Sequence, residues 1–93
     1  KTDIVPTDLG LDFIRLLTPV RFEWKGADGR RHYGLIAQQV AEVAARLEAD
    51  FGGHVLADPE DPHSQQALRY DQFIAPLVRA VQELAERVEA LEG

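Results

Sequence analysis

The sequence predicts an α+β fold, a small body of helix, β-hairpin and helix followed by one long C-terminal helix. Apolar and polar residues alternate over residues 20–25, as in a half-buried strand, and the apolar period becomes helical from residue 37. From residue 70 the apolar spacing alternates between four and three. Helices and short strands therefore follow one another in blocks, which is typical of α+β proteins.

The composition is that of one small globular domain. The 93 residues are 45% hydrophobic and 28% charged, and we divide them into a body, residues 1–69, and a C-terminal coiled-coil helix, residues 70–93. The net charge of -6 argues against nucleic-acid or membrane partners. No segment is apolar enough to span a bilayer, and no signal peptide is visible. The absence of Cys excludes disulfides and thiol chemistry.

The first part of the chain predicts an initial strand or arm and then a short helix. Pro6 favours an extended conformation at Val5, so residues 1–7 form the strand or arm. Asp8 is the predicted N-cap of a helix over residues 9–17, which Thr18 and Pro19 end. Its apolar face contains Leu9, Phe13, Leu16 and Leu17.

A β-hairpin is predicted next. Val20, Phe22 and Trp24 alternate with charged residues in its first strand, and residues 30–37 form the second. The sequence GADG, residues 26–29, supplies a four-residue turn. Gly34 inside the second strand predicts close backbone approach or a bulge.

The middle of the chain predicts a second helix and two short strands. The helix covers residues 37–49 and ends before Gly52 and Gly53. Its apolar face contains Val40, Val43, Ala44 and Leu47. Residues 54–57 and 66–70 are predicted strands on either side of a polar loop. Asp71 is expected to cap the final helix, and Pro76 to loosen or kink its start.

The final helix carries the pattern of a coiled-coil seam. The seam residues are Tyr70, Ile74, Leu77, Val81, Leu84, Val88 and Leu91. Val81 and Val88 take position a, which places Arg87 at g and Glu92 at the following e, where charges of a parallel neighbour meet. Glu83 and Arg87 are expected to form an i,i+4 ion pair.

The first half of this helix has a wider apolar face than the second. The additional residues are Phe73, Val78, Ala80 and Ala85, so this half can cover both its own body and a partner. The alternative is an amphipathic helix that packs only on its own domain. Length argues against it, because a helix of roughly 33 Å would project past so small a body. Four seam side chains contribute about 6–12 kcal/mol against an association cost of about 4–15 kcal/mol, so assembly needs a further contact or upstream sequence.

Other candidate sites are weaker. Asp58, Glu60, Asp61 and His63 share one loop, but two prolines interrupt them, and we expect neither a metal nor another cofactor. His32, His54 and His63 are too scattered for a ligand set. The basic residues Arg21, Lys25, Arg30 and Arg31 alternate with apolar ones, as on a solvated sheet face, which we favour over a nucleic-acid site. Ser64, the only serine, lacks the partners of a nucleophile.

Three segments together resemble a known family. DFIRLLTPVRFEWK, GRRHYGLIAQQV and RYDQFIAPLVRAVQELAERVEALE are similar to the C-terminal intramolecular chaperone domain of phage tail spikes and tail fibres, the chaperone of endosialidase or S74 peptidase family. That family reads as a lysine with an isoleucine soon after, a Leu-rich helix leading into P-V-x-Y/F-x-W, a glycine turn, G-x-I-A-Q-E-V, a tyrosine-aspartate step and a coiled coil. Residues 34–40 are the most specific part of the match.

The resemblance implies a homotrimer that helps an upstream fibre or spike to fold and then cuts itself off through a Ser/Lys dyad. Lys1 matches the dyad lysine, and the serine is expected upstream, outside this sequence, so the chain as given is expected to be inactive. The expected trimer contacts are Ile74, Leu77, Val81, Leu84, Arg87, Val88, Leu91 and Glu92. The resemblance also implies a phage virion protein precursor that assembles in the host cytoplasm.

Several alternatives stay open at this point. Val at a with Leu at d favours two strands in model coiled coils, whereas the family is three-stranded, and we expect the trimer. The domain could be a trimerisation module without proteolysis, or the same self-cleaving module in a membrane-tethered transcription factor. A free-standing hydrolase with paired carboxylates is the least favoured, because no such motif is visible.

Overall fold

The structure is a computed structural model and describes residues 1–26 and 28–92. Its elements in chain order are α1 (Leu11–Leu16), β1 (Val20–Phe22), β2 (His32–Gly34), α2 (Ala37–Arg46), β3 (His54–Leu56), β4 (Gln66–Leu68), the 3-10 turn η1 (Tyr70–Phe73) and α3 (Ile74–Glu92). The predicted α+β fold is confirmed. Ala27 of the predicted turn and Gly93 at the end of the predicted helix lie outside the described residues.

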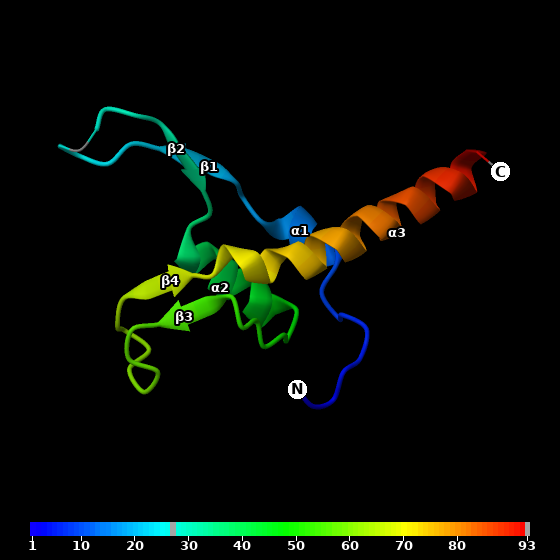
Figure 1. The fold of residues 1–93 in the computed structure, drawn as a ribbon, viewed down its shortest axis with the longest axis horizontal. Helices are drawn as coiled ribbons and strands as arrows, with labels where there is room; N and C mark the ends of the chain where they lie inside the picture. Colours follow the sequence, from blue (N-terminus) through cyan, green and yellow to red (C-terminus); the bar gives the residue numbers. More distant parts are fainter. Residues whose placement is uncertain (27, 93) are drawn as a thin grey trace.

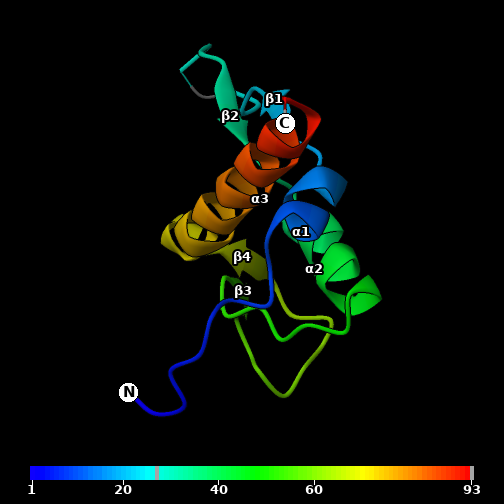
Figure 2. The ribbon, with the colours of Figure 1, turned by 90° about the vertical axis from the view of Figure 1, so that its right-hand side faces the viewer.

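The elements are arranged along α3. In Figure 1 the β1-β2 hairpin and the β3-β4 pair lie toward one end of the molecule, and the C-terminal end of α3 points away from the body at the other. Figure 2, seen from the C-terminal side, shows α1 and α2 on one side of α3, whereas no other element of the described chain covers its opposite side.

The hairpin is present, but its strands are shorter than predicted. Val20 pairs with Gly34 and Phe22 with His32, after which the strands separate and Trp24 is 61% exposed. The connecting segment spans residues 23–31 instead of the predicted four. Within this segment the Arg30 backbone N–H donates to Asp28 Oδ1, at 2.9 Å, rather than to the opposite strand.

The core lies between α1, α2 and the start of α3. The rings of Phe13, Phe51 and Phe73 form its centre, with centroids 5.1 Å apart for Phe13 and Phe51 and 4.8 Å for Phe51 and Phe73. The predicted apolar faces complete it with Leu9, Val40, Val43 and Ala44. A second sheet, β3 with β4, covers the core through Leu68.

The start of α1 differs from the prediction. The N-cap is Gly10, not Asp8, so α1 has no hydrogen bond from a capping side chain. The Leu11 N–H instead points at Glu83 Oε1 of α3, at 3.4 Å. A Cβ on Gly10 would overlap this carboxylate and lie 2.7 Å from Arg79 Cγ, so only glycine allows α1 to approach α3 so closely.

The end of α2 also differs from the prediction. The helix ends at Arg46, three residues earlier than predicted, and it is Glu48, in a left-handed conformation with φ of 53°, rather than Gly52 or Gly53, that follows its end. The Ala49 N–H then donates to the Ala44 carbonyl oxygen at 2.9 Å, which closes the helix with a Schellman-type bond. Glutamate thus occupies a position that usually favours glycine.

The structure corrects two further predictions about the final helix, the Asp71 cap and the Glu83–Arg87 ion pair. Asp71 lies inside η1 and does not cap the helix. The N-cap of η1 is Arg69, and no side chain makes a cap hydrogen bond there. Pro76 is buried in the first turn of α3, where a backbone N–H has no partner within the helix. Glu83 pairs with Arg79, at 3.2 Å, rather than with the predicted Arg87.

Candidate functional site

The candidate site is the exposed apolar face of α3. Its residues are Ile74, Leu77, Val78, Val81, Leu84, Val88 and Leu91, and their exposure ranges from 45% at Leu77 to 88% at Leu91. The neighbouring face of the same helix carries Pro76 and Ala80, which are buried against the body. With Phe73 in η1 also buried, the first half of the helical segment covers its own body and still presents an apolar face to solvent.

The second half of α3 extends beyond the body. The molecule measures 53 × 36 × 24 Å, and Figure 1 shows the last turns of α3 at the far end of the longest axis. Arg87 and Glu92 are exposed on these turns. The expectation that the helix projects past the body is therefore confirmed, and the predicted contact residues lie together on one helix.

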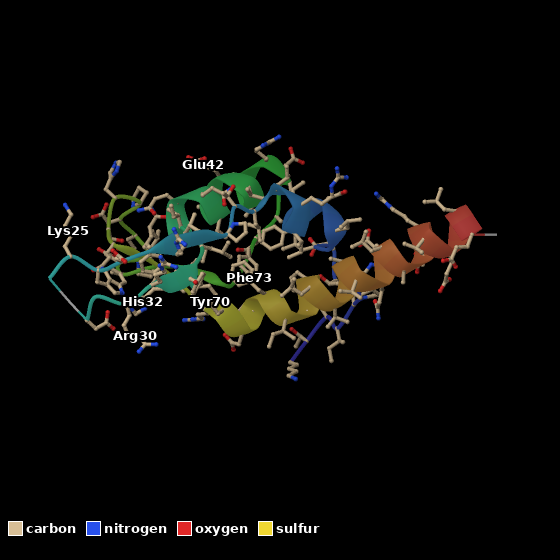
Figure 3. All side chains as sticks on the ribbon, turned by 90° about the horizontal axis from the view of Figure 1, so that it is seen from above. Lys25, Arg30, His32, Glu42, Tyr70 and Phe73 are labelled. Carbon is tan, nitrogen blue, oxygen red and sulfur yellow. The ribbon has the colours of Figure 1, made fainter. Side chains whose placement is uncertain are left out.

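An apolar groove adjoins this face. It has a volume of about 630 Å³. Its walls come from α1, β1, the end of β2 and the start of α3, with Ile14, Leu17, Val20, Leu35, Phe73 and Leu77 as the main apolar residues. Figure 3 shows Phe73 between α3 and the layer of α1 and α2. Leu77 belongs both to the groove and to the exposed face, so the two surfaces are continuous.

Tyr70 ties the start of the helical segment to the hairpin. Its hydroxyl accepts a hydrogen bond from the Leu35 backbone N–H at 3.1 Å. A Cβ on Gly34 would lie 2.7 Å from the same hydroxyl oxygen, so the group that comes close to Gly34 is a side chain and not another backbone segment. The sequence signal was the glycine within a strand; it did not identify Tyr70 as the group that approaches.

Lys1 lies on the exposed arm of residues 1–8, which is neither helix nor strand. Ser64 is the chain's only serine, and its side chain stabilises its own loop. Its hydroxyl donates to the Asp58 carbonyl oxygen at 3.1 Å and accepts from the Asp58 N–H at 3.0 Å. The structure therefore assigns no nucleophile to Lys1, and the Lys1 role stays a prediction.

The acidic loop uses its carboxylates to form turns. Asp58 Oδ1 accepts from the Glu60 N–H at 3.1 Å, and Asp61 Oδ1 accepts from the His63 N–H at 2.9 Å. Among the residues that the structure describes, no three His, Asp or Glu side chains converge as metal ligands. Across residues 1–26 and 28–92, none of the helices combines the length and apolar character needed to cross a membrane.

The basic residues of the hairpin are spread over its exposed surface. Lys25 and Arg30 lie near its tip in Figure 3 and point away from the body. His32 Nε2 lies 3.3 Å from Asp28 Oδ1, so an acidic side chain is interleaved with the basic ones. This arrangement is typical of a solvated sheet surface.

A family model described as chaperone of endosialidase, Peptidase S74, matches residues 1–51. The match covers the arm, α1, the hairpin and α2, and ends at Phe51 of the core. Searches of curated proteins and of solved structures found no match. Because more than half of the chain fits the model, including most of the groove wall, the chain belongs to the chaperone of endosialidase family.

Proposed function

We propose that this domain is an intramolecular chaperone that trimerises through α3 and templates the folding of an upstream phage tail fibre or spike. One observation carries the proposal: α3 packs one face on its own body and leaves the neighbouring apolar face exposed over its whole length. An apolar surface of this size on a small protein indicates a contact with another polypeptide. The family description supplies the chaperone role.

The exposed charges of α3 support a parallel arrangement. In a parallel coiled coil, the g residue of one helix meets the e residue five positions later in the next. Arg87 and Glu92 occupy these two positions, and both are exposed. Their attraction would favour parallel helices in register, which is the arrangement that three chains need if they are to continue into one fibre.

The assembly is tested by sedimentation of the chain over a concentration series. We expect a trimer for the unmodified protein and a monomer for the Val81→Glu, Val88→Glu double variant, because two ionised carboxylates per chain cannot be buried in the seam. The matched control is Ala90→Glu, which adds a carboxylate to the exposed last turns outside the seam. An unmodified chain that sediments as a monomer at every concentration contradicts the proposal.

The family name also supports self-cleavage, with Lys1 as the base that activates a serine upstream. The test expresses the chain with the residues that precede Lys1 in a longer precursor and follows cutting by mass spectrometry. We expect Lys1→Ala and Lys1→Arg to block cutting, because neither side chain can accept the serine proton. Lys25→Ala, on the exposed hairpin, is the matched control. A trimeric precursor that stays uncut although its serine is present leaves a non-proteolytic trimerisation module.

A further inference from the structure

The heptad positions of the helical segment also bear on contacts outside the coiled-coil seam. The rule that pairs g with the e residue five positions later holds for parallel α-helices, and continuing it one residue upstream of α3, into η1, makes Phe73 the first g position. At the end of α3 it pairs Arg87 with Glu92 of a second copy, and one heptad earlier it pairs Ala80 with Ala85. One heptad earlier still, it pairs Phe73 with Val78 of a second copy.

Phe73 and Ala80, the first two g residues, are both buried against their own body, and of the two only Phe73 lines the groove. At the level of Phe73, the surface on the g side of the helical segment is therefore the groove, whose lining includes Phe73 and Leu77. A residue that approaches the g edge of α3 here meets the groove instead.

Val78 is the residue that the helical repeat places opposite this edge. It is 51% exposed, and at position e it lies on the opposite edge of the a/d face from the g position of Phe73. Its side chain is not part of the buried core cluster. One chain thus has an apolar side chain without cover on one edge of α3 and an apolar groove on the other.

We propose that Val78 of a second copy docks in the groove formed by Ile14, Leu17, Val20, Leu35, Phe73 and Leu77. This inference rests on the proposed trimer and names a contact within it. The surface is heterologous, because each copy gives a valine and receives one, and a threefold rotation closes such contacts into a ring. The contact also supplies the apolar burial that the narrow seam lacks.

Engineered disulfides test the contact directly, since the chain contains no cysteine. Two double variants place one thiol at position 78 and one in the groove: Val78→Cys with Leu17→Cys, and Val78→Cys with Val20→Cys. On oxidation, at least one should yield covalent trimers on a non-reducing denaturing gel, because each chain links to both neighbours. The three single variants and the pair Val78→Cys with Ala45→Cys, on an exposed position of α2, should not.

A separate variant distinguishes failure of the contact from failure of the trimer. Val88→Cys alone lies in the seam, so neighbouring copies should form covalent dimers through it. If Val88→Cys links and the chain sediments as a trimer but neither groove pair links, the groove inference is wrong and the proposed trimer stands. If Val88→Cys does not link and the chain sediments as a monomer, both are wrong.

A substitution at the surface provides a second readout that does not depend on disulfide geometry. Val78→Asp should raise the concentration at which half the chains are trimeric by roughly tenfold or more, because the groove would have to take up a carboxylate. The matched control is Ala75→Asp, in the same part of α3 and also exposed, which should leave that concentration unchanged. Equal effects of the two variants contradict the inference.

Discussion

Phe13 holds three elements together, because its completely buried ring in α1 packs on Phe51 after α2 and on Phe73 before α3. Residues with unusual backbone surroundings determine where these elements begin and end. Gly10 and Gly34 lie where a second segment comes too close for a side chain, whereas Glu48 keeps a left-handed conformation without being glycine. We therefore expect substitutions at these three positions to change the free energy of unfolding.

The close approach at Gly34 predicts a compensating pair of substitutions. Gly34→Ala should destabilise the fold by about 1–3 kcal/mol, because its Cβ collides with the Tyr70 hydroxyl. Tyr70→Phe alone should cost about 1 kcal/mol for the lost bond from Leu35. The double variant should cost less than the sum in urea denaturation. Tyr33→Phe, 74% exposed, is the control; strict additivity of the pair would contradict the assigned collision.

The left-handed residue at the end of α2 predicts a stabilising substitution. Glu48→Gly should raise the free energy of unfolding by about 1 kcal/mol, because glycine adopts this conformation without the Cβ penalty. Glu42→Gly, at an exposed position inside α2, should lower it by about 1 kcal/mol. Thermal unfolding measures both. A loss of stability in Glu48→Gly would show that the glutamate side chain contributes more than its backbone strain costs.

At the scale of elements, α3 has two adjacent faces with different surroundings. One face packs on α1 so closely that Gly10 lies beneath Glu83 and Arg79, and the other is the exposed apolar face for which we propose assembly. Glu83 thus contributes to the packing of the body, whereas the next residue, Leu84, belongs to the exposed face. The orientation of α1 relative to α3 therefore also orients the groove, because α1 supplies part of its wall.

The contact between α1 and α3 predicts that Gly10→Ala loosens the body. The new Cβ overlaps the Glu83 carboxylate and meets Arg79, so we expect a loss of about 1–3 kcal/mol in the free energy of unfolding. Gly52→Ala is the matched control, because its Cβ would lie 3.7 Å from Gln72 Oε1, an ordinary contact distance. Denaturant titration should separate the two variants; equal stability would mean that α1 shifts away from α3 without cost.

Whole-molecule stability should depend on protein concentration if α3 assembles as proposed. A ligand or partner that binds only the folded state raises the unfolding temperature by mass action, and here the partner is another copy. We expect the unfolding temperature of the unmodified chain to rise with concentration and that of the Val81→Glu, Val88→Glu variant to stay constant. Calorimetry at several concentrations measures this, and a constant temperature for both chains would contradict assembly.

The parts of the fold that depend on local pattern could be predicted from the sequence. The apolar faces of α1 and α2 and the exposed seam follow from helical periodicity, a property of neighbouring residues. The cap of α1 could not, because Asp8 is a good local cap but contact with Glu83 moves the start of the helix to Gly10. Arg79 and Arg87 are both four residues from Glu83, and only the packed body favours Arg79.

The candidate site divides in the same way. Its exposed face lies on a single helix, so the heptad pattern places the seam residues together on one side, and Val78 comes from the wider apolar face of the first half. The groove was not predictable, because Leu17, Val20, Leu35 and Phe73 come from separate elements and meet only after folding. The pairing of β3 with β4 was missed for a similar reason, since its register depends on contacts across the polar loop.

The division of α3 into a buried and an exposed face has a consequence for the quality of the assembled product. Phe73 and Ala80 hold the helix on its own body, so a chain whose body has not folded presents neither a positioned helix nor a groove. Such a chain could not take its place in a closed ring of three. We therefore expect only chains with a folded body to enter the proposed trimer, and chains with an unfolded body to be excluded from it.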